Sequence, residues 1–208
     1  HAKMSAQAAF RTKVLFDTNQ LLQKAKSEEE IFSLTASQLM KLLNRSLIVY
    51  LEQNGGLGAE QVFGVDGETA QNIFSAPEER DAANWTFANK KRSGAGTDSY
   101  PDAKGLYLAL RTGGGVFGVI GIDLSEKPLD AFENSVLLSI LGEGALAIEN
   151  RRNALEKEQA TVQAKNEELR ANLLRTISHD LRTPLTSISG NASNLLSNGE
   201  TLDRSEER

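Results

Sequence analysis

The stretch LYLALRTGGGVFGVIGID, at residues 106–123, decides the fold. Two runs of apolar, partly β-branched residues flank three consecutive glycines, which is the pattern of a β-hairpin. Gly113, Gly115 and Gly118 also fit G-x-G-x-x-G, the dinucleotide-binding fingerprint. That fingerprint requires a helix directly after the glycines, whereas strand-like residues follow here. We therefore predict a hairpin turn and reject a dinucleotide site.

The sequence before this hairpin predicts a second one, with helices around both. Residues 47–51, LIVYL, precede Asn54-Gly55-Gly56, a turn signal, and a returning strand reaches residue 65. Helices are predicted around residues 14–25 and 27–43, from Pro77 to before Gly94, and from Asp130 onward. Two of them begin with capping boxes, Ser27 with Glu30 and Asp130 with Glu133. Because strands and helices do not alternate, this order indicates an α+β fold, an antiparallel sheet flanked by helices.

Composition excludes several kinds of site. The 208 residues carry 23 Lys+Arg against 28 Asp+Glu, with no Cys and two His. We expect no disulfide, no thiol catalysis and no metal site, and the acidic balance gives no general attraction to nucleic acid. No apolar run approaches the ~18–20 residues of a membrane helix. Histidine chemistry therefore depends on His179, because His1 is the terminal residue.

A long helix carries an apolar row spaced by seven residues: Ile148, Leu155, Val162 and Leu169. Polar residues fill most of the positions between them: Arg152, Gln159 and Asn166, before Leu173. This pattern predicts a parallel two-stranded coiled coil of modest strength, and hence a homodimer. The polar positions suggest two packings of similar energy, so a change in the first region could be transmitted along the helix pair.

The candidate site is TISHDLRTPL, residues 176–185. His179 lies two residues away from an apolar stripe and should face water. Asp180 can orient an imidazole nitrogen or accept its proton, and Thr183 lies one helical turn later on the same face. Pro184 removes a helix hydrogen bond and loosens the backbone nearby. An exposed neutral imidazole with an acidic neighbour suits attack on a phosphoryl group.

Residues 179–185, HDLRTPL, resemble the H-box of sensor histidine kinases at every position. The resemblance implies that His179 is autophosphorylated, that Asp180 assists as general base, and that Thr183 positions water for phosphatase activity. Residues 178–190 are similar to the Kdp-type potassium-sensing members of that family. The loop at residues 95–98, with residues 104–108 after it, resembles their GAF domain. The resemblance therefore implies a GAF fold for the first region.

The resemblance also implies an organisation. We expect a GAF-like sensor domain at 1–148, a coiled-coil signalling helix at 149–174, and the first helix of the dimerisation and phosphoacceptor domain at 175–208. Asn198-Gly199 predicts the end of that helix, and Asp203 with Glu206 predicts the cap of the next helix, as in a truncated helical hairpin of a four-helix bundle. ATP with Mg would bind a downstream domain of the full-length kinase, so this fragment is expected to be inactive alone. The expected partner is a cognate response regulator. The expected location is the cytoplasmic region of an inner-membrane protein, with membrane contact only through upstream segments.

A second hypothesis is a non-enzymatic dimerisation module whose GAF domain binds a small ligand. Five aromatic residues could line its pocket, although core packing is the better explanation for them. They are Trp85, Phe63, Phe87, Phe117 and Tyr107. The basic run at residues 90–92 could hold an anion, but a solvated surface is the simpler interpretation. The sequence does not identify the ligand.

Overall fold

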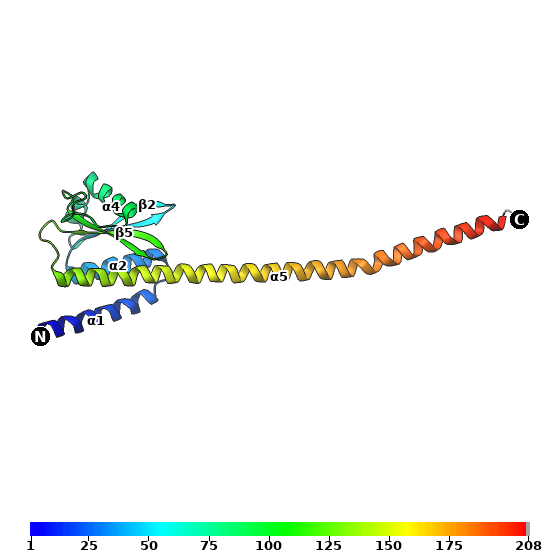
Figure 1. Ribbon diagram of the computed structural model, residues 1–208, viewed down its shortest axis with the longest axis horizontal. Helices are drawn as coiled ribbons and strands as arrows, with labels where there is room; N and C mark the ends of the chain where they lie inside the picture. The colour runs from blue at the N-terminus through cyan, green and yellow to red at the C-terminus, as the bar shows by residue number, and fades with distance from the viewer. Residues whose placement is uncertain (207–208) are drawn as a thin grey trace. The chain divides into compact units, whose positions relative to one another are not determined.

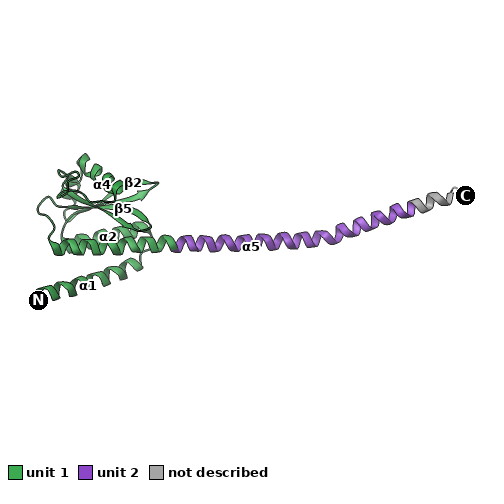
Figure 2. Cartoon of the chain, in the orientation of Figure 1, with its two compact units in different colours: residues 1–153 green, residues 154–208 purple. Residues whose placement is uncertain are grey.

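The computed structural model describes the backbone of residues 1–206 and the side chains of residues 1–199. Two compact units divide the chain, residues 1–153 and residues 154–208 (Figure 2). The first unit contains two helices, a hairpin, two more helices and three strands, followed by the start of the last helix. In order these are α1 (Ala2–Gln23), α2 (Glu28–Leu43), β1 (Leu47–Gln53), β2 (Gly56–Phe63), α3 (Gly67–Ile73), α4 (Pro77–Asn89), β3 (Ser93–Gly94), β4 (Gly105–Thr112), β5 (Gly115–Asp123) and α5 (Ala131–Glu206).

Within residues 1–206 the strands form one antiparallel sheet in the order β2-β1-β5-β4-β3. Strands β4 and β5 are the hairpin predicted from residues 106–123, with Leu108 opposite Ile120. No helix follows its glycines directly, so the rejection of a dinucleotide fingerprint is confirmed. Gly118 serves packing instead, because a Cβ there would lie 2.4 Å from the Tyr50 carbonyl oxygen.

Alternation along the central strands divides the core into two clusters, one on each face of the sheet. Leu47 and Val49 of β1 belong to the cluster that includes residues of α2 and α5. Ile48 and Tyr50 belong to the second cluster, which includes Ala82 and Ala83 of α4. The sheet therefore carries helices on both faces, as Figure 1 shows, and the predicted α+β class is confirmed.

The predicted capping box of Asp130 and Glu133 forms in full. That of Ser27 and Glu30 forms in part, because the Glu30 carboxylate accepts from the Lys26 amide over 2.7 Å and not from that of Ser27. The Glu30 amide donates to Ser27 Oγ over 3.1 Å at the start of α2. At the start of α5, the Glu133 amide donates to Asp130 Oδ1 over 2.7 Å and the Asp130 amide donates to Glu133 Oε2 over 3.0 Å. Each box satisfies amides that the first turn leaves without helical partners, which explains why these helices begin where they do.

Helix α2 lies antiparallel to the first part of α5. Glu28, at the start of α2, contacts Arg152, whereas Arg45, just after α2, contacts Glu133. Between these two contacts the helices approach closely at Gly144, where a Cβ would lie 2.7 Å from the Thr35 hydroxyl oxygen. The glycine therefore permits the helix approach that closes this face of the core.

One prediction about helices is wrong, and one helix was not predicted. Helix α5 continues through Asn198 and Gly199 to Glu206, so the predicted helix end is wrong. A glycine inside a helix costs only about 1 kcal/mol, which is too little to end this one. The predicted cap formed by Asp203 and Glu206 concerns side chains outside the described ones. Helix α3 was not predicted, because its seven residues are too few to show an apolar period.

By length and composition alone, α5 also meets a criterion for membrane-spanning helices. Within Ala131–Gly199, one 18-residue window has a mean hydropathy of 1.3, and 39% of it is buried in the protein. Leu137, Ile140 and Ile148 of α5 are fully buried in the core of the first unit. Core packing against the sheet therefore accounts for much of this apolar character, and the criterion alone is weak evidence for a membrane span.

The second core cluster predicts a loss of stability at alkaline pH. Burial raises the pKa of Tyr50 to about 12, with the Arg80 guanidinium, 4.9 Å from the ring centroid, opposing the shift. A raised pKa means that the neutral phenol stabilises the fold below pH 10 and that this contribution is lost as pH rises toward 12. The Tyr50→Phe variant keeps the ring and should lose less stability over this interval than the parent. Urea unfolding midpoints at pH 8 to 11.5 test this, and identical pH slopes would contradict it.

Candidate functional site

Helix α5 carries the candidate phosphoacceptor, His179, and exposes its side chain to solvent. Its side chain is 80% exposed and that of Asp180 is 73% exposed. His179 Nδ1 lies 3.5 Å from Asp180 Oδ1, so the carboxylate flanks one ring nitrogen. An exposed pair at this distance contributes little to stability. The arrangement instead leaves the other ring nitrogen open to a reactant from outside the helix.

Thr183 and Pro184 lie in the next turn of the same helix. Thr183 is exposed and four residues after His179, so both side chains share one face. Pro184 lies inside α5 without ending it. Its nitrogen has no proton to donate to the carbonyl four residues earlier, that of Asp180. The helix is therefore missing one backbone hydrogen bond next to His179, as the sequence predicts.

An apolar row lies beside this polar face and has no partner within the described part of the chain. Its members are between 51% and 62% exposed, although aliphatic side chains of this size are usually buried. They are Leu173, Ile177, Leu181 and Leu185. A single helix cannot bury its own stripe, so this face is suited to packing against another helix.

The start of the coiled-coil row is already occupied within the chain. Ile148 is fully buried in the core of the first unit. Arg152 forms a bidentate pair with Glu28, with N···O distances of 2.8 and 2.9 Å. The hydrogen bond from Arg152 to Glu28 raises the pKa of the Arg152 guanidinium. The prediction that these two residues lie in an interhelical seam is therefore wrong, because heptad spacing does not show whether a face is covered by the chain's own sheet.

The five aromatic residues do not gather around one pocket. Tyr107 is fully buried in the second cluster, with Phe87 packed against it. Phe117 lies in the first cluster, with Phe63 packed against that cluster on the other face of the sheet. Trp85 is partly buried on α4. Core packing thus accounts for these side chains, and they do not form one ligand site.

Local hydrogen bonds hold the loop that resembles the family's GAF domain, and one residue of the basic run at 90–92 contacts α5. The Thr97 hydroxyl lies 2.8 Å from the Gly94 carbonyl oxygen and 2.9 Å from that of Ser99. Gly94 has a φ of +91°, and a Cβ there would lie 2.0 Å from the Gly105 carbonyl oxygen. Only glycine fits this position. Arg92 donates to Asn134 over 3.0 Å, so it joins the loop to α5 and is not a free anion ligand.

A buried carboxylate on α4 is a polar centre that the sequence did not reveal. Glu79 is only 1% exposed and accepts hydrogen bonds from the amides of Lys104 and Gly105 and from the Tyr107 hydroxyl. Burial and the hydrogen bond to Glu79 raise the pKa of Tyr107. The adjacent Glu78 is exposed, so residue type does not distinguish the two glutamates. The one signal in the sequence is that Glu79 lies three and four residues before Ala82 and Ala83, which places it on the buried face of α4.

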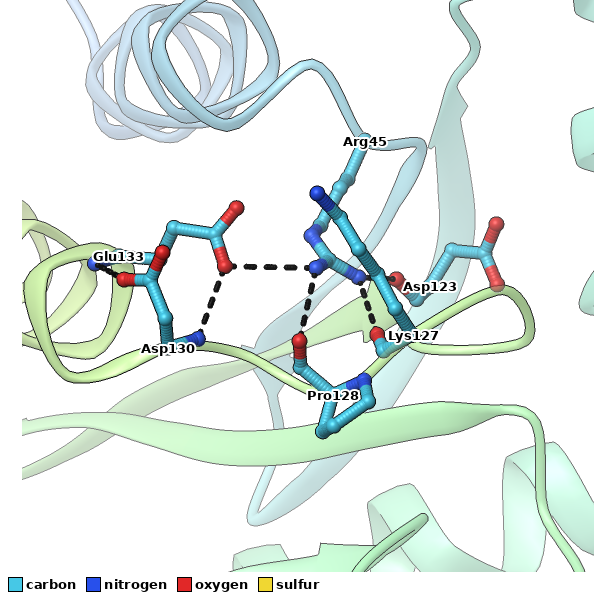
Figure 3. A network of polar contacts seen from close by, with 6 residues as sticks. All are labelled: Arg45, Asp123, Lys127, Pro128, Asp130 and Glu133. Atoms are coloured by element: carbon cyan, nitrogen blue, oxygen red, sulfur yellow. Dashed lines mark hydrogen bonds and ion pairs between the residues drawn. The ribbon is translucent and has the colours of Figure 1, made fainter.

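Arg45 forms a second buried centre, which Figure 3 shows. Its guanidinium donates to the carbonyl oxygens of Asp123, Lys127 and Pro128, at 3.1, 2.7 and 3.1 Å. It also pairs with Glu133 of α5 at 3.4 Å, while only 7% of its side chain is exposed. Glu133 belongs to the capping box of α5, so Arg45 ties the end of β5 and the following loop to the first turn of that helix. The contacts are distant in sequence, and no local pattern announces them.

Among the described residues, no group of three or more His, Asp or Glu side chains is placed to hold a metal ion. The expectation that the chain has no metal site stays a prediction. Backbone amides and the Tyr107 hydroxyl satisfy Glu79, and backbone carbonyls with Glu133 satisfy the two terminal nitrogens of Arg45, although its buried Nε has no partner. These contacts within the fold give both centres a structural role. His179 is thus the exposed residue with chemistry still to explain.

Comparison with known proteins agrees with this description. Residues 169–208 match the His Kinase A (phospho-acceptor) domain. The chain is 37% identical over 194 residues to the sensor protein KdpD of Clostridium acetobutylicum, a region covering 93% of this chain and 22% of that protein. It is 28% identical over 185 residues to KdpD of Escherichia coli, covering 88% of this chain and 20% of the relative. The chain therefore spans about a fifth of the length of these relatives.

A solved structure supports the fold of the first unit. The GAF domain of the potassium sensor histidine kinase KdpD from Escherichia coli superposes with a TM-score of 0.53 at 19% identity. The match covers 73% of this chain and 99% of that domain, and at this identity it shows the fold alone. The chain is thus similar over nearly its whole length to KdpD sensor histidine kinases, with a GAF fold followed by a His Kinase A phospho-acceptor segment.

Proposed function

We propose that this chain is the sensor-and-relay segment of a potassium-related two-component histidine kinase, and that His179 is its phosphoacceptor. The observation that carries the proposal is the exposure of His179, 80%, within a segment that matches the phospho-acceptor family. In this proposal the sensor domain is followed by a signalling helix over 149–174 and the phosphoacceptor helix over 175–208. ATP with Mg is bound elsewhere in the full-length protein.

The proposed chemistry is a nucleophilic displacement at phosphorus. A ring nitrogen of neutral His179 attacks the γ-phosphorus of ATP, a nitrogen–phosphorus bond forms, and the bond from the γ-phosphorus to the bridging oxygen breaks to release ADP. The imidazole then carries an excess proton, which Asp180 accepts at the nitrogen 3.5 Å from its carboxylate. A second displacement passes the phosphoryl group to an Asp of the cognate response regulator.

The position of the label tests the proposal. Full-length protein containing this segment is incubated with [γ-³²P]ATP and Mg, and the labelled peptide is mapped. We expect an acid-labile, alkali-stable label on the peptide that contains His179. A label on a hydroxyl side chain, or on a different peptide, would overturn the assignment.

The neighbours of His179 should separate two activities. Asp180→Asn removes the proton acceptor and should slow autophosphorylation by about a hundredfold, as for other positioned general bases. Thr183→Ala leaves the nucleophile intact, so autophosphorylation should persist while dephosphorylation of the response regulator falls. Initial rates of both reactions in full-length protein give the comparison. Equal loss of both rates in the Thr183 variant would contradict the proposed role for its hydroxyl.

We also propose that the chain acts as a homodimer in the cytoplasm. The exposed row that includes Ile177 and Leu181 supports pairing, and the row at Leu155, Val162 and Leu169 supports a parallel coiled coil before it. A change in the sensor unit would alter the packing of the two helices and so the presentation of His179. Control of potassium transport is the proposed output, by similarity to the KdpD relatives.

The alternative of a ligand-binding dimerisation module makes a separate claim. A ligand that binds the native first unit should raise its melting temperature by mass action. This function would be compatible with the kinase role, but the separation of the aromatic residues into two clusters gives it no support.

A further inference from the structure

Arg152 lies where α5 leaves the first unit, and it contacts three other elements there. Its Nε and Nη2 donate to the two carboxylate oxygens of Glu28 on α2. Its Nη2 also lies 3.6 Å from Glu52 Oε2 of β1. The guanidinium carbon lies 4.9 Å from the ring centroid of Phe117 on β5. A bidentate pair together with a cation–π contact fixes the direction of an arginine side chain better than a single ion pair does.

The position of Arg152 in the heptad pattern of α5 connects these contacts with the pairing of two chains. Ile148 and Arg152 occupy successive positions of the row that continues with Leu155 and Val162. The first two are held within their own chain, whereas Leu155 and Val162 are 43% and 54% exposed. Leu155 is therefore the first member of the row that is available to a second chain. Arg152 occupies the last position before this change from intrachain to interchain packing.

We infer that Arg152 sets the rotational phase in which α5 leaves the sensor unit. While Arg152 is bound to Glu28 and Glu52, the helix presents the Leu155 row to a partner helix in one orientation. When the contacts break, α2 and β1 no longer hold the turn of α5 that follows Ile148, and the pairing at Leu155 changes. This inference rests on the proposed function, because it assumes the homodimer.

The exposure of the three charged side chains suits a reversible contact. Arg152, Glu28 and Glu52 are 34%, 26% and 22% exposed. Ion pairs that remain partly hydrated are individually weak. A small change in the sheet or in α2 is therefore enough to release them, which a permanently buried pair such as Arg45 with Glu133 would not allow.

Disulfide cross-linking can measure the phase directly, because the chain has no cysteine of its own. Single cysteines are introduced at positions 154, 155, 158 and 159 of the 208-residue chain, which span an arc of about 140° on the side of the helix that carries Leu155. Cross-linking rates under mild oxidation give a profile for the dimer. The same four cysteines are then combined with Arg152→Gln, Arg152→Lys, Glu28→Gln and the control Arg151→Gln.

We expect Arg152→Gln and Glu28→Gln to change the ratio of the fastest to the slowest position by about three- to fivefold, the population change that weak ion pairs support. Arg152→Lys keeps the charge and should restore the parent profile in part. Arg151→Gln alters the adjacent arginine, which makes none of these contacts, and should leave the profile unchanged.

Two contrary results have different meanings. An unchanged profile in both Arg152→Gln and Glu28→Gln overturns the inference and leaves the proposed dimer intact. An absence of cross-links at all four positions, and also at positions 162 and 169, overturns the proposed homodimer and the inference with it. If Arg152→Gln does not fold, the profile of Glu28→Gln decides the inference, because that variant weakens the same contact from α2.

Discussion

If His179 is the proposed phosphoacceptor, replacing it by glutamine is expected to reduce phosphorylation of the full-length protein by at least about a thousandfold, because the amide is no nucleophile. Glutamine is similar in length to histidine and favours helix, so α5 should be unaffected. The side chain is 80% exposed, and its loss removes no core contact. Incorporation of ³²P from ATP, measured against time, gives the rate for parent and variant.

Two controls make the result specific to the imidazole. Ser178→Ala changes an adjacent exposed side chain and should retain most of the parent rate. Sedimentation of the His179→Gln variant should still report a dimer, because the apolar row at Ile177 and Leu181 is unaltered. Phosphorylation of His179→Gln at a rate close to that of the parent would show that the acceptor is another residue.

Replacing Arg45 by alanine should produce the largest loss of stability, about 3–5 kcal/mol in the free energy of unfolding. The substitution leaves the carbonyl oxygens of Lys127 and Pro128 and the carboxylate of Glu133 without their buried donor. Such orphaned acceptors cost more than the original bonds contributed. Urea unfolding followed by the fluorescence of Trp85, the single tryptophan, reports on this unit.

An exposed arginine provides the matched control for Arg45. Arg80 also pairs with a glutamate, Glu60, at 3.3 Å, but their side chains are 39% and 57% exposed. Arg80 also donates to the Leu57 carbonyl oxygen over 2.9 Å and lies over the Tyr50 ring, so Arg80→Ala should cost about 1–2 kcal/mol, still less than Arg45→Ala. If the two variants lose equal stability, burial is not the cause of the effect, and the central role assigned to Arg45 is wrong.

The hairpins and capping boxes could be predicted because their signals are local. The glycines at 113–115 and the pairs Ser27 with Glu30 and Asp130 with Glu133 each lie within a few residues of the structure they specify. The candidate phosphoacceptor was predicted for the same reason, since its motif is contiguous and its side chains are meant to face solvent. Such features need no knowledge of the rest of the fold.

The buried polar centres could not be predicted, because their partners are distant in sequence. Glu79 is held by amides 25 and 26 residues later, and Arg45 is held by oxygens 78 to 88 residues later. In a linear sequence both look like ordinary surface charges. The prediction that Arg152 lies in an interhelical seam failed for a related reason. A heptad position shows which face of the helix a residue occupies but not what covers that face.

The antiparallel packing of α2 on α5 determines where this segment can be recombined with others. Two ion pairs hold the stretch of α5 between residues 133 and 152 at its two ends. They are Arg45 with Glu133 and Arg152 with Glu28. A chimera joined inside that stretch would separate the first unit from one of these two ion pairs. A junction placed after residue 153 preserves both ion pairs. If the number of residues up to His179 changes only by whole heptads, the side of the helix on which His179 lies is also preserved. The best position at which to join the first unit to another protein therefore lies inside a continuous helix and not in a loop.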